Sequence, residues 1–193
     1  MADRGDDEIT GWALAAGRGD RVALTAFVRA TQRDVHRFLA HLISPREADD
    51  LAQETYLRAL GALPGFAGRS GGRTWLLAIA RRVGADHLRA AGRRPRTNPV
   101  DDWDAVARIE PRPAAVRSGV DESIALRALI ETLDSDRREA FVLTQLLDLS
   151  YAEAAEVCGC PIGTIRSRVA RAREDLVAAM QAPAEPRRRI SGA

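Results

Sequence analysis

The chain has 193 residues, of which 46% are hydrophobic and 29% are charged, a composition that supports two small domains or one medium domain and argues against an intrinsically disordered protein. Its 29 basic and 27 acidic residues leave a net charge of only +2, but every basic residue is an arginine, so the position of the charges matters more than their sum. No apolar run reaches the roughly 20 residues of a membrane span, and the acidic start is unlike a signal peptide. We therefore expect a cytoplasmic protein without membrane insertion.

The cysteines and histidines do not form a metal-binding pattern. Cys158 and Cys160 are too close for an ordinary disulfide and too few for a structural zinc site, so we expect small buried apolar groups. His36 and His41 have no partner at metal-ligand spacing, and His87 falls on an apolar helix face as a core histidine. No metal and no cofactor are expected.

Helical periodicity begins near the N-terminus. A short helix over residues 8–16 should end at Gly17, and a long helix should open near Asp20. The prediction of the long helix rests on one stripe of residues at helical spacing, nearly all of them apolar. It consists of Leu24, Phe27, Val28, Thr31, Val35, Phe38, Leu39 and Leu42.

Two further helices are predicted before residue 91. The segment Ser44–Glu47 has the form of a capping box with proline at the first helical position, so a third helix should begin near Pro45 and run to about Leu63. Pro64 and Gly65 end it, and a fourth helix should start near Arg73 after the glycine-rich stretch over 65–72.

The remaining sequence divides into a linker, a second helical block and a tail. Prolines and arginines over 91–119 favour an extended linker. Periodicity returns over 121–180 with three interruptions, which predicts four compact helices, and residues 183–193 should be a disordered tail. With no alternating strand pattern, we predict an all-α fold with domains over 1–90 and 120–182.

The second block contains a predicted helix-turn-helix. Ser150 can cap a helix with Glu153 at its third position, Gly159 suits the left-handed residue that ends it, and Pro161 starts the next helix. Two helices joined this tightly are typical of DNA-binding proteins in which the second helix enters the major groove.

A helical wheel separates the faces of that second helix. The packed face should contain Ile165, Val169, Ala172 and Leu176. The outward face should contain Gly163, Arg166, Ser167, Ala170 and Arg171. Arginines and a serine can bind phosphates or base edges, although an arginine-rich solvated helix is the alternative.

Wheels of the third and fourth helices give two more surfaces. In the third helix, Ala48, Ala52, Thr55, Tyr56 and Ala59 should face inward, opposite Asp50, Gln53, Glu54 and Leu57. An exposed leucine among polar groups is either an ordinary surface residue or a docking anchor. In the fourth helix, Leu76, Ile79, Ala80, Val83 and His87 should face inward, opposite a stripe of Thr74, Ala78, Arg81, Arg82 and Arg89. Such a basic stripe can follow phosphates.

The loop between these helices holds Phe66, Arg69 and Ser70 among glycines. This mixture can stack on and hydrogen-bond an unstacked base. The glycines can equally serve only to close a turn.

Four motifs together resemble the extracytoplasmic-function (ECF) group of bacterial sigma factors. They are Asp49–Ala59, Arg73–Arg81, Asp86–Arg89 and Cys160–Arg168, and they occur in the family's order over nearly the whole chain. The resemblance implies a sigma region 2-like four-helix domain and a region 4-like helix-turn-helix domain joined by an extended linker. It also implies a transcription initiation factor that is not an enzyme, binds core RNA polymerase and promoter DNA, and promotes strand opening.

The resemblance assigns roles by position. Docking on the coiled coil of the polymerase's largest subunit would use Asp50, Gln53, Glu54 and Leu57. Binding of the minus-ten element would use Phe66, Arg69, Ser70, Arg73, Trp75, Arg81, Arg82 and Arg89, with Trp75 as structural support. Binding of the minus-thirty-five element would use Thr164, Arg166, Ser167 and Arg171. The polymerase flap region and an anti-sigma factor are further partners of the family, but no residue here names a particular anti-sigma factor.

Two departures from the family pattern and two alternative functions bear on this interpretation. The family often has asparagine where this chain has Arg82 and phenylalanine where it has Gly72, so the bases read in the minus-ten element stay open. A stand-alone helix-turn-helix regulator that binds an operator as a dimer explains only the last third of the chain. An enzyme would need paired carboxylates or a nucleophile–base set, which we do not find.

Overall fold

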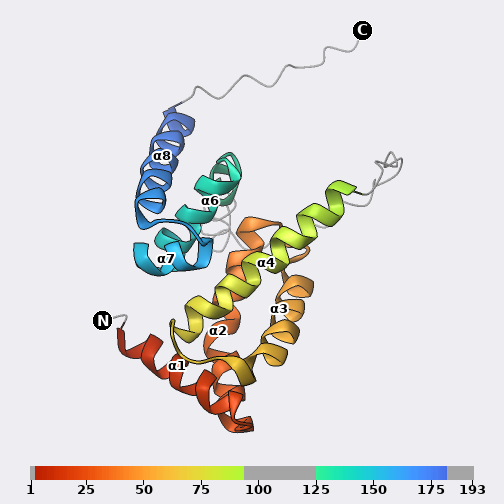
Figure 1. Cartoon of the computed structure of the whole chain (residues 1–193). Helices are drawn as coiled ribbons and strands as arrows, with labels where there is room; N and C mark the ends of the chain where they lie inside the picture. The colour runs from red at the N-terminus through yellow and green to blue at the C-terminus, as the bar shows by residue number, and fades with distance from the viewer. Residues whose placement is uncertain (1–2, 94–124, 182–193) are drawn as a thin grey trace, which may run out of the picture.

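The computed structural model describes residues 3–93 and 125–181, and throughout these residues the regular structure is helical (Figure 1). The first part contains α1 (Asp3–Gly17), α2 (Arg21–Leu42), α3 (Ala48–Ala62), a 3₁₀ turn η1 (Leu63–Gly65) and α4 (Gly72–Arg93). The second part contains a helix over 125–131, α6 (Ser135–Phe141), a π-helical turn η3 (Val142–Leu146), α7 (Tyr151–Cys158) and α8 (Ile162–Gln181). The all-α prediction is confirmed, whereas most of the predicted linker and the predicted tail lie outside the described residues. None of the described helices is long and apolar enough to cross a membrane.

α2 begins directly after Asp20, where the sequence predicted that the long helix starts. Asp20 occupies the N-cap position, and its Oδ1 accepts hydrogen bonds from the backbone N–H groups of Val22 (2.8 Å) and Ala23 (3.0 Å). These bonds satisfy two of the donors that every helix leaves free at its start. The predicted apolar stripe then buries Phe27 and Phe38 in the core.

The predicted capping box at the start of the third helix is wrong. α3 begins at Ala48, three residues after Pro45, and Glu47 at the N-cap position makes no side-chain cap bond. The Ser44 hydroxyl instead donates to Glu47 Oε2 at 2.9 Å, so both side chains of the motif bind each other and neither binds the helix backbone. Asp49 in the first turn offers the helix dipole a negative charge instead.

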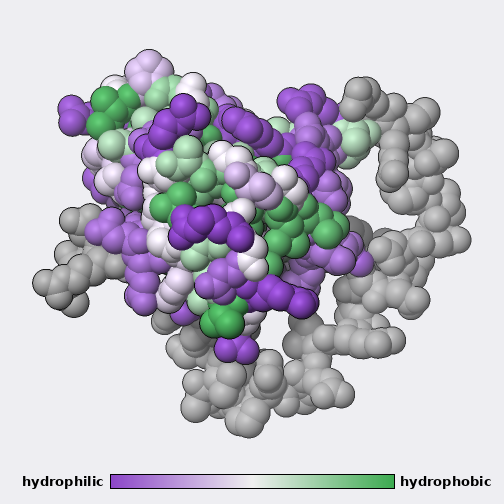
Figure 2. Space-filling view, turned by 60° about the horizontal axis from the view of Figure 1, so that its bottom comes forward, coloured by the Kyte–Doolittle hydropathy of each residue, from purple (hydrophilic) through white to green (hydrophobic). Residues whose placement is uncertain are grey.

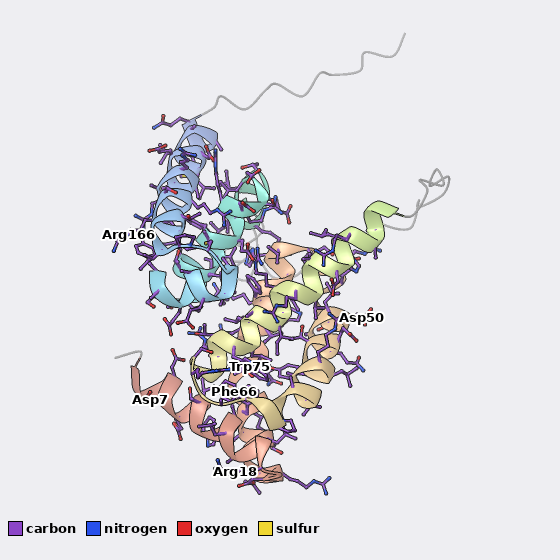
Figure 3. The ribbon with its side chains drawn as sticks, in the orientation of Figure 1. Asp7, Arg18, Asp50, Phe66, Trp75 and Arg166 are labelled. Carbon is purple, nitrogen blue, oxygen red and sulfur yellow. The ribbon has the colours of Figure 1, made fainter. Side chains whose placement is uncertain are left out.

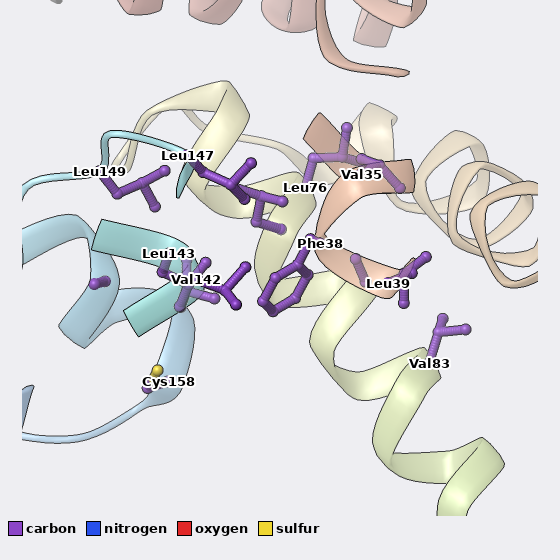
Figure 4. Close-up of a cluster of buried hydrophobic side chains, with 14 of the residues drawn as sticks. Val35, Phe38, Leu39, Leu76, Val83, Val142, Leu143, Leu147, Leu149 and Cys158 are labelled. Atoms are coloured by element: carbon purple, nitrogen blue, oxygen red, sulfur yellow. The ribbon is translucent and has the colours of Figure 1, made fainter. Parts of the chain in front are cut away.

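The two parts of the chain pack on each other through one continuous core. α4 packs against α1, α2 and α3 of its own part and against α7 of the second part, while α2 also contacts α6 and η3 (Figure 1). In Figure 4, Phe38 of α2 and Leu76 of α4 lie beside Val142 and Leu147 of the second part, and all four side chains are buried. Association of the two parts therefore removes apolar side chains of both from water.

Three positions of α4 differ from the helical-wheel prediction. Thr74, predicted on the exposed stripe, is only 3% exposed, because α4 also contacts α1 and α7 and a wheel with a single buried face does not account for this. His87, predicted in the core, lies at the edge, where its Nε2 is 2.7 Å from Glu47 Oε1. Leu77 is buried as well, although the wheel did not place it inside.

The cysteines agree with the prediction in part. Both are free thiols, but only Cys158 is buried, and Cys160 is half-buried. Burial raises the pKa of the Cys158 thiol, so this group is unreactive at neutral pH. Among the described residues, no cluster of His, Cys, Asp and Glu has the geometry of a metal site.

Candidate nucleic-acid and protein interfaces

The helix-turn-helix has the predicted local geometry. The Glu153 N–H donates to Ser150 Oγ at 3.2 Å, and the Ser150 N–H donates to Glu153 Oε2 at 2.8 Å, which completes a capping box. Gly159 ends α7 in the left-handed region with φ 64°, where glycine is tolerated best. The chain then turns directly into α8.

The two faces of α8 are those predicted by the wheel. Ile165, Val169 and Ala172 are buried, and Leu176 is half-buried. All five residues of the predicted outward face are exposed, namely Gly163, Arg166, Ser167, Ala170 and Arg171. Thr164 is half-buried at the edge of this face. Figure 3 shows Arg166 on the outer side of α8, turned away from the rest of the molecule.

The arginines of α8 fall into two classes. Arg168 forms an ion pair with Asp136, and Arg173 donates to Gln145 Oε1 at 2.8 Å. Arg166 and Arg171 are exposed and make no hydrogen bond or ion pair within the described parts of the chain. Only the second pair has its full donor capacity available for a nucleic acid.

The outward face of α3 is present, but one of its carboxylates is already bound. Asp50, Gln53 and Leu57 are exposed, and Leu57 retains 58% of its surface. Glu54 instead accepts a hydrogen bond from Arg58 Nε at 2.7 Å. Leu60, 42% exposed and one turn further on, extends the apolar patch, although the wheel did not select it. We call Asp50, Gln53, Leu57 and Leu60 the α3 face.

Arg58 of α3 also forms an ion pair with α4. Arg58 NH1 also donates to Asp86 Oδ2 of α4 at 2.7 Å, and Asp86 receives a further hydrogen bond from Arg89. The hydrogen bonds from Arg58 and Arg89 lower the pKa of Asp86. Arg89 of the predicted basic stripe is therefore engaged with its own helix in this structure.

The loop before α4 supports an aromatic pair. The rings of Phe66 and Trp75 lie 4.9 Å apart with an interplanar angle of 42°, and Figure 3 shows the two side chains together at the start of α4. This tilted contact stabilises the loop through Trp75. Arg69 beside it is exposed and Ser70 is half-buried.

Two predicted minus-ten arginines are bound by the second part of the chain. Arg73 donates from Nε to Asp34 Oδ2 at 2.7 Å and from NH2 to the Leu147 carbonyl at 2.6 Å. Arg81 Nε donates to Glu139 Oε1 at 2.5 Å, and the Glu139 side chain is only 6% exposed. Of the predicted stripe, Arg82 is the exposed arginine that has no partner among the described residues.

A third arginine joins the same interface. Arg37 of α2 donates from NH1 to the Leu146 carbonyl at 2.9 Å, a contact between residues far apart in sequence that no motif predicts. Arg37, Arg73 and Arg81 thus bind acceptors at the end of η3 and on α6. These acceptors are backbone carbonyls and one buried carboxylate, so no periodic pattern could have identified them.

Comparisons with known proteins agree with this architecture. Sigma-70 region 2 matches residues 27–94, and sigma-70 region 4 matches residues 123–176. The ECF RNA polymerase sigma factor SigC of Mycobacterium tuberculosis is 52% identical over 179 residues, covering 90% of this chain and 91% of that protein. The ECF RNA polymerase sigma-E factor of Escherichia coli is 34% identical over 165 residues, covering 81% and 86% of the two chains.

Solved structures give the same result. Sigma factor RpoE of Bartonella quintana, in complex with the anti-sigma factor NepR, matches with a TM-score of 0.66 and 30% identity over 83% of this chain and 98% of that chain. CnrH, in complex with the cytosolic domain of CnrY, has a TM-score of 0.71 over 92% of this chain and 99% of that chain, and at 24% identity it supports the fold alone.

A region 2 domain followed by a region 4 helix-turn-helix defines the sigma-70 class of transcription proteins. Within that class, this chain belongs to the extracytoplasmic-function group of sigma factors.

Proposed function

We propose that this protein binds core RNA polymerase, directs it to promoters with two separate DNA-binding surfaces, and promotes strand opening without catalysing a reaction itself. The observation that carries the proposal is the outward face of α8, where Arg166 and Arg171 are exposed without partners while Arg168 and Arg173 are held within the domain. This face has the side chains that bind phosphates and guanine edges in the major groove. We assign it, with Thr164 and Ser167, to the minus-thirty-five element.

The loop before α4 is proposed to bind an unpaired base of the minus-ten element. Phe66 is held by Trp75, and the same loop continues with Arg69, which is exposed, and Ser70, which is half-buried. Aromatic and polar groups of this kind hold single-stranded bases. Arg82 is proposed to bind the adjacent phosphate backbone.

The α3 face is proposed to dock on the coiled coil of the polymerase's largest subunit. Leu57 and Leu60 supply an exposed apolar centre, and Asp50 and Gln53 supply polar groups around it. An apolar centre with a polar rim is the usual composition of a protein interface. In Figure 3, Asp50 lies on the side of the molecule opposite Arg166, so polymerase and minus-thirty-five DNA would approach from different sides.

Core polymerase would let the two weak DNA-binding surfaces act together. By fixing the separation of the two domains, it raises the effective concentration of the second surface at its DNA element once the first surface has bound. Arg73 and Arg81 must then leave Leu147 and Glu139 before they can bind DNA. An anti-sigma factor is included among the proposed partners because the relative RpoE is found in complex with one.

In vitro transcription with purified core polymerase over a random promoter library tests the proposal. The full chain should direct initiation from a defined promoter class, and Arg166→Ala should reduce it strongly. Arg173→Ala is the matched control on the same helix and should leave initiation nearly unchanged. Tight binding of the free protein to a duplex operator as a dimer, without any response to core polymerase, would support the regulator alternative instead.

A further inference from the structure

A basic cavity lies between α2, α3 and the helix over 125–131. Its volume is about 750 Å³, within the range of roughly 300 to 1,000 Å³ found for small-molecule sites. α2 contributes one long wall, α3 contributes Ala52 and Gln53, and the second part of the chain closes the end with Leu126, Arg127 and Leu146. We call it the interdomain groove. It borders the α3 face at Gln53 but has no role in the function proposed above.

The charge of the groove is strongly one-sided. The ionisable side chains that line it are Arg33, His36, Arg37, His41, Arg127, the phenol of Tyr56 and a single carboxylate, Asp49. The carboxylate lies 3.2 Å from His36, and Arg37 donates to the Leu146 carbonyl, so Arg33 and Arg127 face the groove without a lining carboxylate beside them. A concave surface lined by one sign of charge concentrates ions of the opposite sign.

Two buried polar atoms in the groove have no hydrogen-bond partner. They are His41 Nδ1 and Arg127 Nε, and among the described residues only one other buried side-chain atom, Arg138 Nε, shares this condition. Both nitrogens are closed off from solvent, so a ligand in the groove would bind the accessible atoms of these two side chains rather than the buried nitrogens themselves. Arg33, exposed on α2, likewise has no partner within the described residues.

The groups around His41 point to an anion in particular. Burial lowers the pKa of His41, the nearby Arg127 and Arg37 lower it further, and Glu131 opposes them. A bound anion would offset the two arginines and favour the imidazolium form, which donates from both ring nitrogens. Val28, Ala40, Leu126 and Leu146 supply apolar wall beside these groups.

We propose that the interdomain groove binds a small organic anion, of the size of a nucleoside monophosphate, whose phosphate is held by His41 and Arg127 and whose organic body lies against Leu126 and Leu146. Such a ligand would contact α2 and the helix over 125–131 at the same time. It would therefore bind best to the arrangement in which the two parts of the chain are packed together.

Titration calorimetry of the full chain with adenosine 5′-monophosphate tests this site. We expect saturable binding at one site, with adenosine and inorganic phosphate each bound at least tenfold more weakly. Arg127→Ala and His41→Gln should each weaken binding by about tenfold or more, since a charge-assisted hydrogen bond is lost.

Arg82→Ala and Arg166→Ala are the controls, because both remove an exposed arginine from a proposed DNA surface. They should leave nucleotide binding unchanged. Equal affinity for inorganic phosphate would overturn the proposed contact with the organic body, and binding that survives Arg127→Ala and His41→Gln would overturn the site. If no probe binds while these two variants weaken association with core polymerase, the groove is a protein-docking surface and the proposal is wrong.

Discussion

At the scale of single residues, the α8 arginines that are exposed and have no partner in the described parts of the chain are the ones we expect to contact DNA. Arg166→Ala should weaken binding of promoter DNA in the polymerase complex by about 1 to 3 kcal/mol if the guanidinium binds a base edge. A phosphate contact would instead reduce the salt dependence by about one unit of slope. Fluorescence anisotropy over a range of salt concentrations separates the two cases. An unchanged affinity and slope would contradict the assignment.

His41 should give the folded protein a pH-dependent stability of known sign. Burial and then the arginines Arg127 and Arg37 hold its pKa below the ordinary 6.5, so the unfolded chain binds more protons when the pH falls below that value. Stability should therefore decrease as the pH falls through 6.5 toward the lower pKa of the folded state.

Urea unfolding between about pH 8 and about pH 5 measures this effect, and His41→Gln should reduce the decrease at the acidic end. The histidine that remains half-exposed beside Glu47, His87, provides the comparison variant. A decrease on acidification that is equally large in the wild type and in His41→Gln would contradict the sign derived for His41.

Residues differ in how far their roles could be predicted. Asp20, Ser150 and Gly159 act through neighbours a few positions away, so local signals predicted the start of α2 and both ends of α7. Arg73 and Arg81 act through Leu147 and Glu139, whose positions depend on how the two parts of the chain pack. No short-range pattern contains that information.

At the scale of elements, α1 is attached to the first domain by a close backbone approach. A Cβ at Gly17 would lie 2.5 Å from the carbonyl oxygen of Leu63 in η1, whereas a Cβ at Gly11 on the same helix would meet nothing within 4 Å. The sequence identified Gly17 only as the end of a helix. Its packing role became visible only with the fold.

Gly17→Ala should therefore destabilise the protein by about 1 to 3 kcal/mol, the usual cost of overpacking. Gly11→Ala, the matched control, should stabilise α1 by up to about 1 kcal/mol, because alanine has the higher helix propensity. Urea unfolding of both variants, with hydrogen exchange of α1, measures the difference. Equal stability of the two variants would show that α1 does not pack closely on η1 in solution.

A helical wheel predicts the buried face of α8 correctly but predicts the buried residues of α4 only in part. α8 packs on one side, so apolar period and burial agree at Ile165 and Val169. α4 is packed on opposite sides, so Thr74 and Leu77 are buried together with Leu76. Periodicity predicts which helices exist, but the number of buried faces depends on neighbours distant in sequence.

At the scale of the whole molecule, the contact between the two parts combines apolar burial with a few polar bonds. Phe38 and Val142 exclude water from its centre (Figure 4). Figure 2 shows that, on the face drawn there, apolar groups lie in patches bordered by hydrophilic ones. The polar bonds across the contact, made by Arg37, Arg73 and Arg81, are directional and so suited to set the relative position of the two parts, while the buried apolar centre supplies most of the stabilisation.

Glu139→Ala should weaken the contact by about 1 to 3 kcal/mol. It leaves the Arg81 guanidinium without its carboxylate in a site where the side chain is 34% exposed, so water offsets part of the cost of a fully buried broken pair. Small-angle scattering should show a larger radius of gyration. Arg81→Ala should expand the protein in the same way from the other side of the contact.

Asp175→Ala supplies the control for this experiment. It breaks the ion pair with Arg137, which joins α8 to α6 within the second part at 2.6 Å, and it leaves the contact with α4 intact. Its radius of gyration should match that of the wild type, and circular dichroism should show that all three variants retain their helices. Should Glu139→Ala and Arg81→Ala remain as compact as Asp175→Ala, the apolar contacts around Phe38 and the bonds of Arg37 and Arg73 would suffice to hold the two parts together, and Arg81 could be released to DNA without separating them.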